Sequence, residues 1–206
     1  MKTDVVKVDN MWNGADKAFQ EVEEFCVHQK LSEKDSLRFR LLTEEMMGMV
    51  KSIAGEFVAD FWAENTGSCC ELHLCVSTQM DRKKHQEFLN TSRGEEHVTV
   101  KGIMGKIRNI LELYMTGYVE NSVQQKKSGV NMMTYGMSDM EDAGKENKNE
   151  WSLQSYKVAV LSRKTDDKET EEAKDELEKS IVAKLADDVR VRVHANTVEM
   201  VVYKKF

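Results

Sequence analysis

The sequence predicts an α/β (α+β) two-layer sandwich, in which a mixed, mostly antiparallel sheet carries helices on one face. Short segments with apolar residues at every second position alternate along the chain with longer segments whose apolar residues recur every three or four positions. The first pattern is typical of half-buried strands and the second of amphipathic helices. Neither a sequence repeat nor a change in composition divides the 206 residues, so we expect a single domain over residues 1–206.

The first part of the chain predicts one strand and two helices. Residues 4–9 alternate and predict a short strand, and residues 13–30 have helical apolar spacing. Ser32 is followed three residues later by Asp35, which is the pattern of a capping box. The second helix begins there, and Gly55 marks its expected end.

The middle of the chain predicts a hairpin followed by a helix. Residues 56–64 and 71–79 alternate, and the polar turn at 65–68 separates them. Residues 81–89 predict a polar, weakly helical connection. Helical spacing returns over residues 99–119. By parity Trp62 falls on the polar face of its strand, where it is either a contact residue or an ordinary surface residue.

The last part begins with a segment of low order. Residues 121–150 predict a long loop, and 121–170 an inserted or loop-rich acidic segment. Residues 151–161 fit either a strand or a helix, and we favour the helix. A highly charged helix over 163–186 follows.

The chain closes with a predicted hairpin over residues 188–204. Valines alternate with polar residues on both sides of Ala195–Asn196, which form the expected turn. The final hairpin therefore adds two strands to the predicted sheet.

Composition and charge exclude several classes of function. The net charge is −6 and the pI about 5.5, which disfavours general binding to nucleic-acid phosphates. No run approaches the ~18 apolar residues of a membrane-spanning helix, and the polar amino terminus does not resemble a secretion signal. We therefore expect a cytoplasmic protein without nucleic-acid or membrane partners.

The cysteines do not predict a metal site. Cys69 and Cys75 lie six residues apart on a predicted strand, which separates them by about 20 Å. Two thiolates on one zinc ion must each lie about 2.3 Å from it. We therefore expect no metal at these cysteines.

The order of elements, together with Ser32–Asp35 (SEKD) and Leu41–Glu45 (LLTEE), resembles the anti-sigma-factor serine kinases. These proteins share the histidine-kinase-like ATPase fold with gyrase and heat-shock protein 90. The resemblance covers residues 4–120 and the final hairpin at 188–204. It requires the strands at 56–64 and 71–79 to be adjacent in space.

The resemblance assigns roles on the second helix. Glu45 falls on the family's glutamate, which can serve as general base. The family's magnesium-binding asparagine lies four residues later, where this chain has Met49. A thioether is a soft ligand and magnesium requires hard oxygen ligands, so Met49 cannot replace that asparagine.

The resemblance also implies a nucleotide site for ATP or ADP. Asp81 is the candidate for recognising adenine, although the glycines that follow the aspartate in the family are missing; its alternative role is a helix cap. Gly102, Gly105 and Lys106 form the candidate phosphate cradle before a helix. Their alternative role is to start that helix and pack it closely on the sheet.

These departures predict a non-catalytic regulatory protein with an ATPase-like fold, acting by protein binding, with nucleotide binding weakened or lost. The resemblance implies a protein partner, such as a transcription regulator, and a homodimer. The acidic segment 166–178 favours a basic partner. The alternative is an active ATP-binding serine kinase or ATPase that uses Glu45, and a third reading is an α/β domain unrelated to this family.

Overall fold

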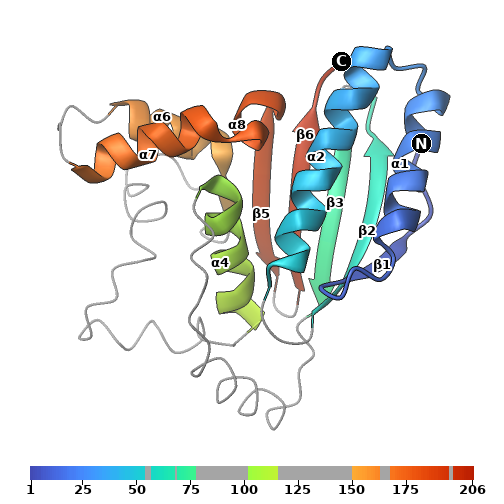
Figure 1. Ribbon diagram of the computed structural model, residues 1–206, viewed down its shortest axis with the longest axis horizontal. Coiled ribbons are helices and arrows are strands. Elements are labelled where there is room, and N and C mark those ends of the chain that lie inside the picture. The colour runs from blue at the N-terminus through green and yellow to red at the C-terminus, as the bar shows by residue number, and fades with distance from the viewer. Residues whose placement is uncertain (54–56, 68, 78–101, 116–149, 163–167, 195–196) are drawn as a thin grey trace, which may run out of the picture.

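The computed structural model describes residues 1–53, 57–67, 69–77, 102–115, 150–162, 168–194 and 197–206. These residues form six helices and one six-stranded sheet (Figure 1). The strands are β1 Val6–Asp9, β2 Val58–Asn65, β3 Cys70–Ser77, β4 Glu150–Ser152, β5 Asp188–His194 and β6 Thr197–Lys204. The helices are α1 Ala15–His28, α2 Glu33–Lys51, α4 Ile103–Met115, α6 Leu153–Ser162, α7 Lys168–Lys179 and α8 Ile181–Leu185.

The sheet has the strand order β1-β2-β3-β6-β5-β4. The carboxy-terminal hairpin β5–β6 therefore lies between β3 and the edge strand β4, and it joins the two ends of the chain in one sheet. Every pairing among these strands is antiparallel, so the described sheet lacks the parallel pairs expected of a mixed sheet. The predicted adjacency of the two middle strands is confirmed, because β2 pairs with β3.

One face of the sheet forms the hydrophobic core. Residues directly opposite each other on neighbouring strands point to the same face. One such row crosses all six strands and is buried throughout: Val6, Phe61, Leu74, Met200, Val191 and Trp151. Alternation predicted the inward position of Phe61, Leu74, Val191 and Met200, because successive side chains of a strand point to opposite faces. Trp151 was expected in a helix and joins this row through β4.

Helices α1 and α2 lie across strands of this sheet (Figure 1). Helix α2 begins as predicted, because the Ser32 hydroxyl accepts a hydrogen bond from the Asp35 amide at 3.2 Å. It ends at Lys51, a few residues before the glycine expected to stop it. Gly14 directly precedes α1 and has a φ of +78°, a conformation that favours glycine. A Cβ at this position would also lie 1.9 Å from the Lys7 carbonyl oxygen.

Two elements differ from the prediction. The chain forms β4 at Glu150–Ser152 before α6, although we expected a helix to begin at residue 151. Three residues are too short to show an alternation, and β4 is defined by its pairing with β5. The Ser152 hydroxyl then accepts a bond from the Ser155 amide, and buried Asp188 accepts one from the Gln154 amide. These bonds start α6 immediately after β4.

The charged helix expected over residues 163–186 is two helices. Ser180 interrupts it between α7 and α8, where its backbone is extended and its hydroxyl accepts a hydrogen bond from the Ala183 amide at 3.1 Å. The carboxy-terminal half of the predicted insert, residues 150–162 and 168–170, forms β4, α6 and the start of α7. The loop was expected at 121–150, and its last residue, Glu150, belongs to β4. Residues 121–149 of that loop, the connection at 81–89 and the turn at 195–196 lie outside the described residues.

Candidate functional site

A hollow of about 590 Å³ lies where α2, the start of α4, α7 and the start of α8 meet. Its described lining consists of Glu45, Gly102, Ile103, Met104, Glu172, Asp175, Glu176, Lys179, Ser180 and Ile181. Two residues of the predicted nucleotide site, Glu45 and Gly102, therefore lie at one place. Cavities of a few hundred to about 1,000 Å³ are typical of ligand sites.

Local backbone conformation shapes the hollow. Gly102 has a φ of +94° and directly precedes the first residue of α4. The Lys106 amide donates to the Gly102 carbonyl at 3.1 Å, which closes the first turn of that helix. On the side formed by α7 and α8, the break at Ser180 ends α7, and Ile181, the first residue of α8, lines the hollow.

Glu45 is half-buried in this hollow. Burial raises the pKa of the Glu45 carboxyl, and the charge of neighbouring Glu44 raises it further. Glu44 is bonded to Arg40 at 3.3 Å, whereas Glu45 has no hydrogen bond or ion pair with the side chains that the structure describes. Glu45 can therefore accept a proton or a cationic group that enters the hollow.

Lys106 has an acidic partner of its own. Its Nζ atom donates to Glu176 Oε2 at 2.8 Å and lies 5.1 Å from the centroid of the Tyr156 ring. Burial by itself lowers the pKa of Lys106, but the bond to Glu176 and the contact with Tyr156 outweigh burial and raise it. The lysine of the predicted phosphate cradle is thus charged and already paired.

The remaining predicted residues do not line the hollow as described. Gly105 is buried within the first turn of α4, and Met49 is buried in the core at 3% exposure. Met49 therefore packs and does not face the hollow beside Glu45. Asp81 lies outside the described residues, so its two predicted roles stay predictions.

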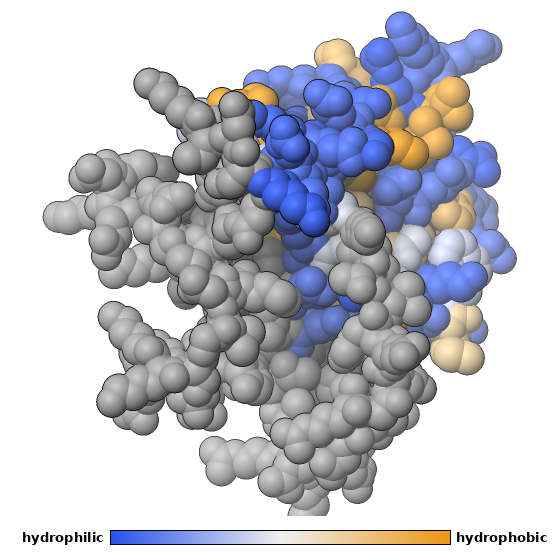
Figure 2. All heavy atoms as spheres, turned by 60° about the vertical axis from the view of Figure 1, so that its left-hand side comes forward, coloured by the Kyte–Doolittle hydropathy of each residue, from blue (hydrophilic) through white to orange (hydrophobic). Residues whose placement is uncertain are grey.

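Negative charge dominates the hollow. Its described lining carries four carboxylates (Glu45, Glu172, Asp175 and Glu176) and one lysine, Lys179. Lys179 donates to Asp175 at 2.6 Å. The side of the molecule on which α6 to α8 lie is largely hydrophilic, with smaller hydrophobic patches beside it (Figure 2). Like charges repel most strongly in a partly enclosed site, so this lining disfavours phosphate groups.

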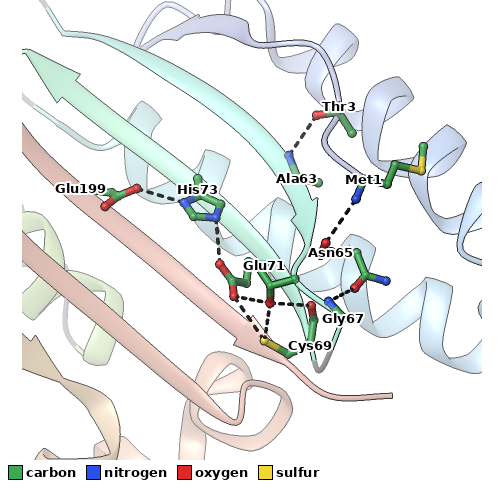
Figure 3. Close-up of polar contacts among 10 residues, drawn as sticks. Met1, Thr3, Ala63, Asn65, Gly67, Cys69, Glu71, His73 and Glu199 are labelled. Atoms are coloured by element: carbon green, nitrogen blue, oxygen red, sulfur yellow. Dashed lines mark hydrogen bonds and ion pairs between the residues drawn. The ribbon is translucent and has the colours of Figure 1, made fainter.

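A second polar cluster lies on the sheet face opposite the core (Figure 3). His73 Nδ1 lies 3.0 Å from Glu199 Oε1, and His73 Nε2 lies 3.1 Å from Glu71 Oε2. A neutral imidazole has one N–H group, so only the protonated ring donates to both carboxylates. The Trp62 ring stacks on His73 with centroids 4.6 Å apart, and Lys2 Nζ lies 4.1 Å from the centroid of the Trp62 ring.

Sequence reasoning placed Trp62 on the polar face, which is confirmed, but it missed the cluster around His73. Register places Trp62 opposite His73, and His73 opposite Val201 on β6. The contact with Glu199 joins residues 126 positions apart, so no local spacing could reveal it. The Glu71–His73 spacing of two on one strand was the available signal.

The described residues contain no group of three or more histidine, cysteine, aspartate or glutamate side chains able to hold a metal ion. Within the described ranges, no helix combines the length and apolar character needed to cross a bilayer. In comparisons with known proteins, no family model, no curated protein and no solved structure matches the chain. The function of this chain is therefore inferred from the residues of the hollow.

Proposed function

We propose that this chain is a non-catalytic regulatory protein that acts by binding another protein through the hollow between α2, α4, α7 and α8. The observation that carries this proposal is the pairing of Lys106 with Glu176. The lysine that would hold a phosphate is bound to Glu176, and the hollow that Glu176 lines has three further carboxylates. A nucleotide would have to displace Glu176 and approach this negative charge, so nucleotide binding is weakened or lost.

We also propose that the fold is a two-layer sandwich related to the histidine-kinase-like ATPases. The adjacent strands β2 and β3, and the position of Glu45 on α2 beside the start of α4, support this relationship. The partner would be a cytoplasmic protein such as a transcription regulator, and the chain would form a homodimer as that family does.

A second candidate is an active ATP-dependent serine kinase or ATPase. One observation favours it: Glu45 faces the hollow and its pKa is raised, which is a useful property for a general base near neutral pH. This candidate needs an oxygen ligand for magnesium in place of Met49, which is buried in the core. It also needs Lys106 to leave Glu176.

A thermal-shift experiment distinguishes the two candidates. The unfolding temperature of the full chain is measured with ATP or ADP at millimolar concentration, each with and without magnesium. Our proposal predicts no shift, because a ligand stabilises only the state that binds it. A magnesium-dependent rise in the unfolding temperature would contradict it, whether or not the rise remains in Glu45→Gln, because a general base acts in turnover and is not required for nucleotide binding. Glu178→Gln is the control for Glu45→Gln, because Glu178 lies on α7 but does not line the hollow.

A further inference from the structure

We infer that the hollow binds a basic, amphipathic segment of the partner, with one lysine or arginine on Glu45 and an apolar side chain on Ile181. This inference rests on the proposed function and names the partner's chemistry. It depends on two features of the hollow: the carboxylate of Glu45, which has no ion pair among the described residues, and the apolar side chain of Ile181.

The charges of the hollow show where a cation from outside would bind. Asp175 and Glu176 already hold Lys179 and Lys106 at 2.6 and 2.8 Å. Glu172 has a long and exposed pair with Lys168 at 3.8 Å. Glu45 alone is a half-buried carboxylate of the lining with no ion pair among the described residues. A cation at Glu45 would reverse the rise in its pKa, because an opposite charge stabilises the ionised carboxylate.

The hollow also contains apolar surface. Ile181 lines it with 42% of its surface exposed, so part of an apolar side chain in the hollow is in contact with water. Ile103 and Met104 line it as well and are buried at 1% and 9% exposure. A wholly polar basic tail would leave Ile181 in water, whereas an apolar side chain next to the cation would cover it.

Size and charge together define the kind of occupant. A volume of about 590 Å³ accommodates a few side chains of a segment and not a folded domain. Two carboxylates of the lining, Glu176 and Asp175, already bind the ammonium groups of Lys106 and Lys179, so a further cation is chemically compatible with the hollow. Charge complementarity thus favours a cation at Glu45, and the exposed part of Ile181 favours an apolar side chain next to that cation.

The test measures binding of designed peptides to the full chain by fluorescence anisotropy at low salt. The first peptide is a labelled amphipathic helix of leucine and lysine. The second replaces its lysines with glutamate, and the third replaces its leucines with serine. We expect the first peptide to bind at least roughly tenfold more tightly than either of the others, since both the cation and the apolar side chain contribute.

Matched variants place the binding in the hollow. Glu45→Gln and Ile181→Ser should each weaken the leucine–lysine peptide by roughly fivefold or more. The controls Glu178→Gln and Val158→Ser make the same chemical changes outside the hollow and should alter affinity less than about twofold. Val158 is exposed on α6 and does not line the hollow. The unfolding temperature of each variant shows whether it remains folded.

Equal weakening by Glu45→Gln and Glu178→Gln would mean that bulk charge attracts the peptide, and it would overturn the inference. Equal binding of all three peptides, or no binding, would also overturn it. If the peptide test fails and ATP and ADP also fail to bind in the same preparation, the inference about the peptide is overturned but the proposed protein-binding function is not. If magnesium-dependent ATP binding competes with the leucine–lysine peptide, the proposed function fails together with the inference.

Discussion

Lys106 Nζ lies 2.8 Å from Glu176 Oε2, which joins the first turn of α4 to the last turns of α7. The two residues are 70 positions apart, so the bond joins two helices that are distant in the sequence. It also pairs the lysine that the sequence predicted for a phosphate cradle with a carboxylate.

Removing the carboxylate from this pair should destabilise the protein modestly. Glu176→Gln should lower the free energy of unfolding by about 1 kcal/mol, because the pair is only partly exposed. Glu172→Gln is the control, since its pair with Lys168 is long and exposed, and it should cost less than about 0.3 kcal/mol. Urea unfolding at pH 7 measures both. Equal effects would show that Lys106 and Glu176 are not coupled.

The same pair predicts a pH dependence. The folded-state pKa of Lys106 is raised above its usual 10.5, so its contribution is complete below that pH. The contribution is lost as the pH rises through the folded-state pKa. The difference in stability between the wild type and Glu176→Gln should therefore shrink in strongly alkaline urea titrations and stay constant between pH 7 and 9.

Gly14 should tolerate no side chain. Gly14→Ala should lower the free energy of unfolding by about 3 kcal/mol, because the new Cβ would meet the Lys7 carbonyl oxygen and the backbone is left-handed. Gly67→Ala is the control, since its φ of +89° carries the backbone penalty of about 1 kcal/mol, but nothing lies within 4 Å of its Cβ. Similar losses for both variants in chemical denaturation would contradict the close approach at Gly14.

Neutralising Glu45 should stabilise the protein slightly. The folded-state pKa of Glu45 is raised, so its ionised form is disfavoured on folding at neutral pH. Glu45→Gln removes that disadvantage, and the gain should disappear as the pH falls through the raised pKa to below 4.5, where the wild-type carboxyl is protonated in both states. Unfolding of both proteins across this pH range is the measurement. A loss of stability at pH 7 would show that Glu45 makes a favourable contact.

His73 should matter more to stability than an ordinary surface histidine. It is 8% exposed, contacts Glu71 and Glu199, and stacks on Trp62. His73→Ala should lower the free energy of unfolding by about 2 kcal/mol, because it leaves two carboxylates without this partner. His28→Ala, at the exposed end of α1, should cost less than about 0.5 kcal/mol. A comparable loss in the two variants would refute a special role for His73.

The sequence was most informative where local rules decide the structure. Ser32 and Asp35 predicted the start of α2, and the alternation of β2 and β3 predicted both the hairpin and the position of Trp62 on the polar face of its strand. The break at Ser180 was missed because neither glycine nor proline marks it, and a single hydroxyl starts α8. Strand β4 was missed because its three residues are too few to show an alternation, and they form a strand only by pairing with β5.

The candidate site was predictable only in part, because some of its contacts join residues that are distant in the sequence. The sequence placed Glu45 and the glycine at the start of α4 together, and the hollow contains both. It did not reveal that Glu176 would pair with Lys106, because that contact depends on how α7 packs against α4. Because Glu176 neutralises Lys106 and the lining carries further carboxylates, the site is acidic, whereas a phosphate cradle would be basic.

The most direct test of this account is a calorimetric titration of the full chain with ATP and with ADP, each with and without magnesium. The account predicts no binding heat up to millimolar nucleotide, because Glu45, Glu172, Asp175 and Glu176 line the hollow and Lys106 is already paired. Micromolar binding that strengthens with magnesium would contradict it and would establish the chain as a nucleotide-binding protein.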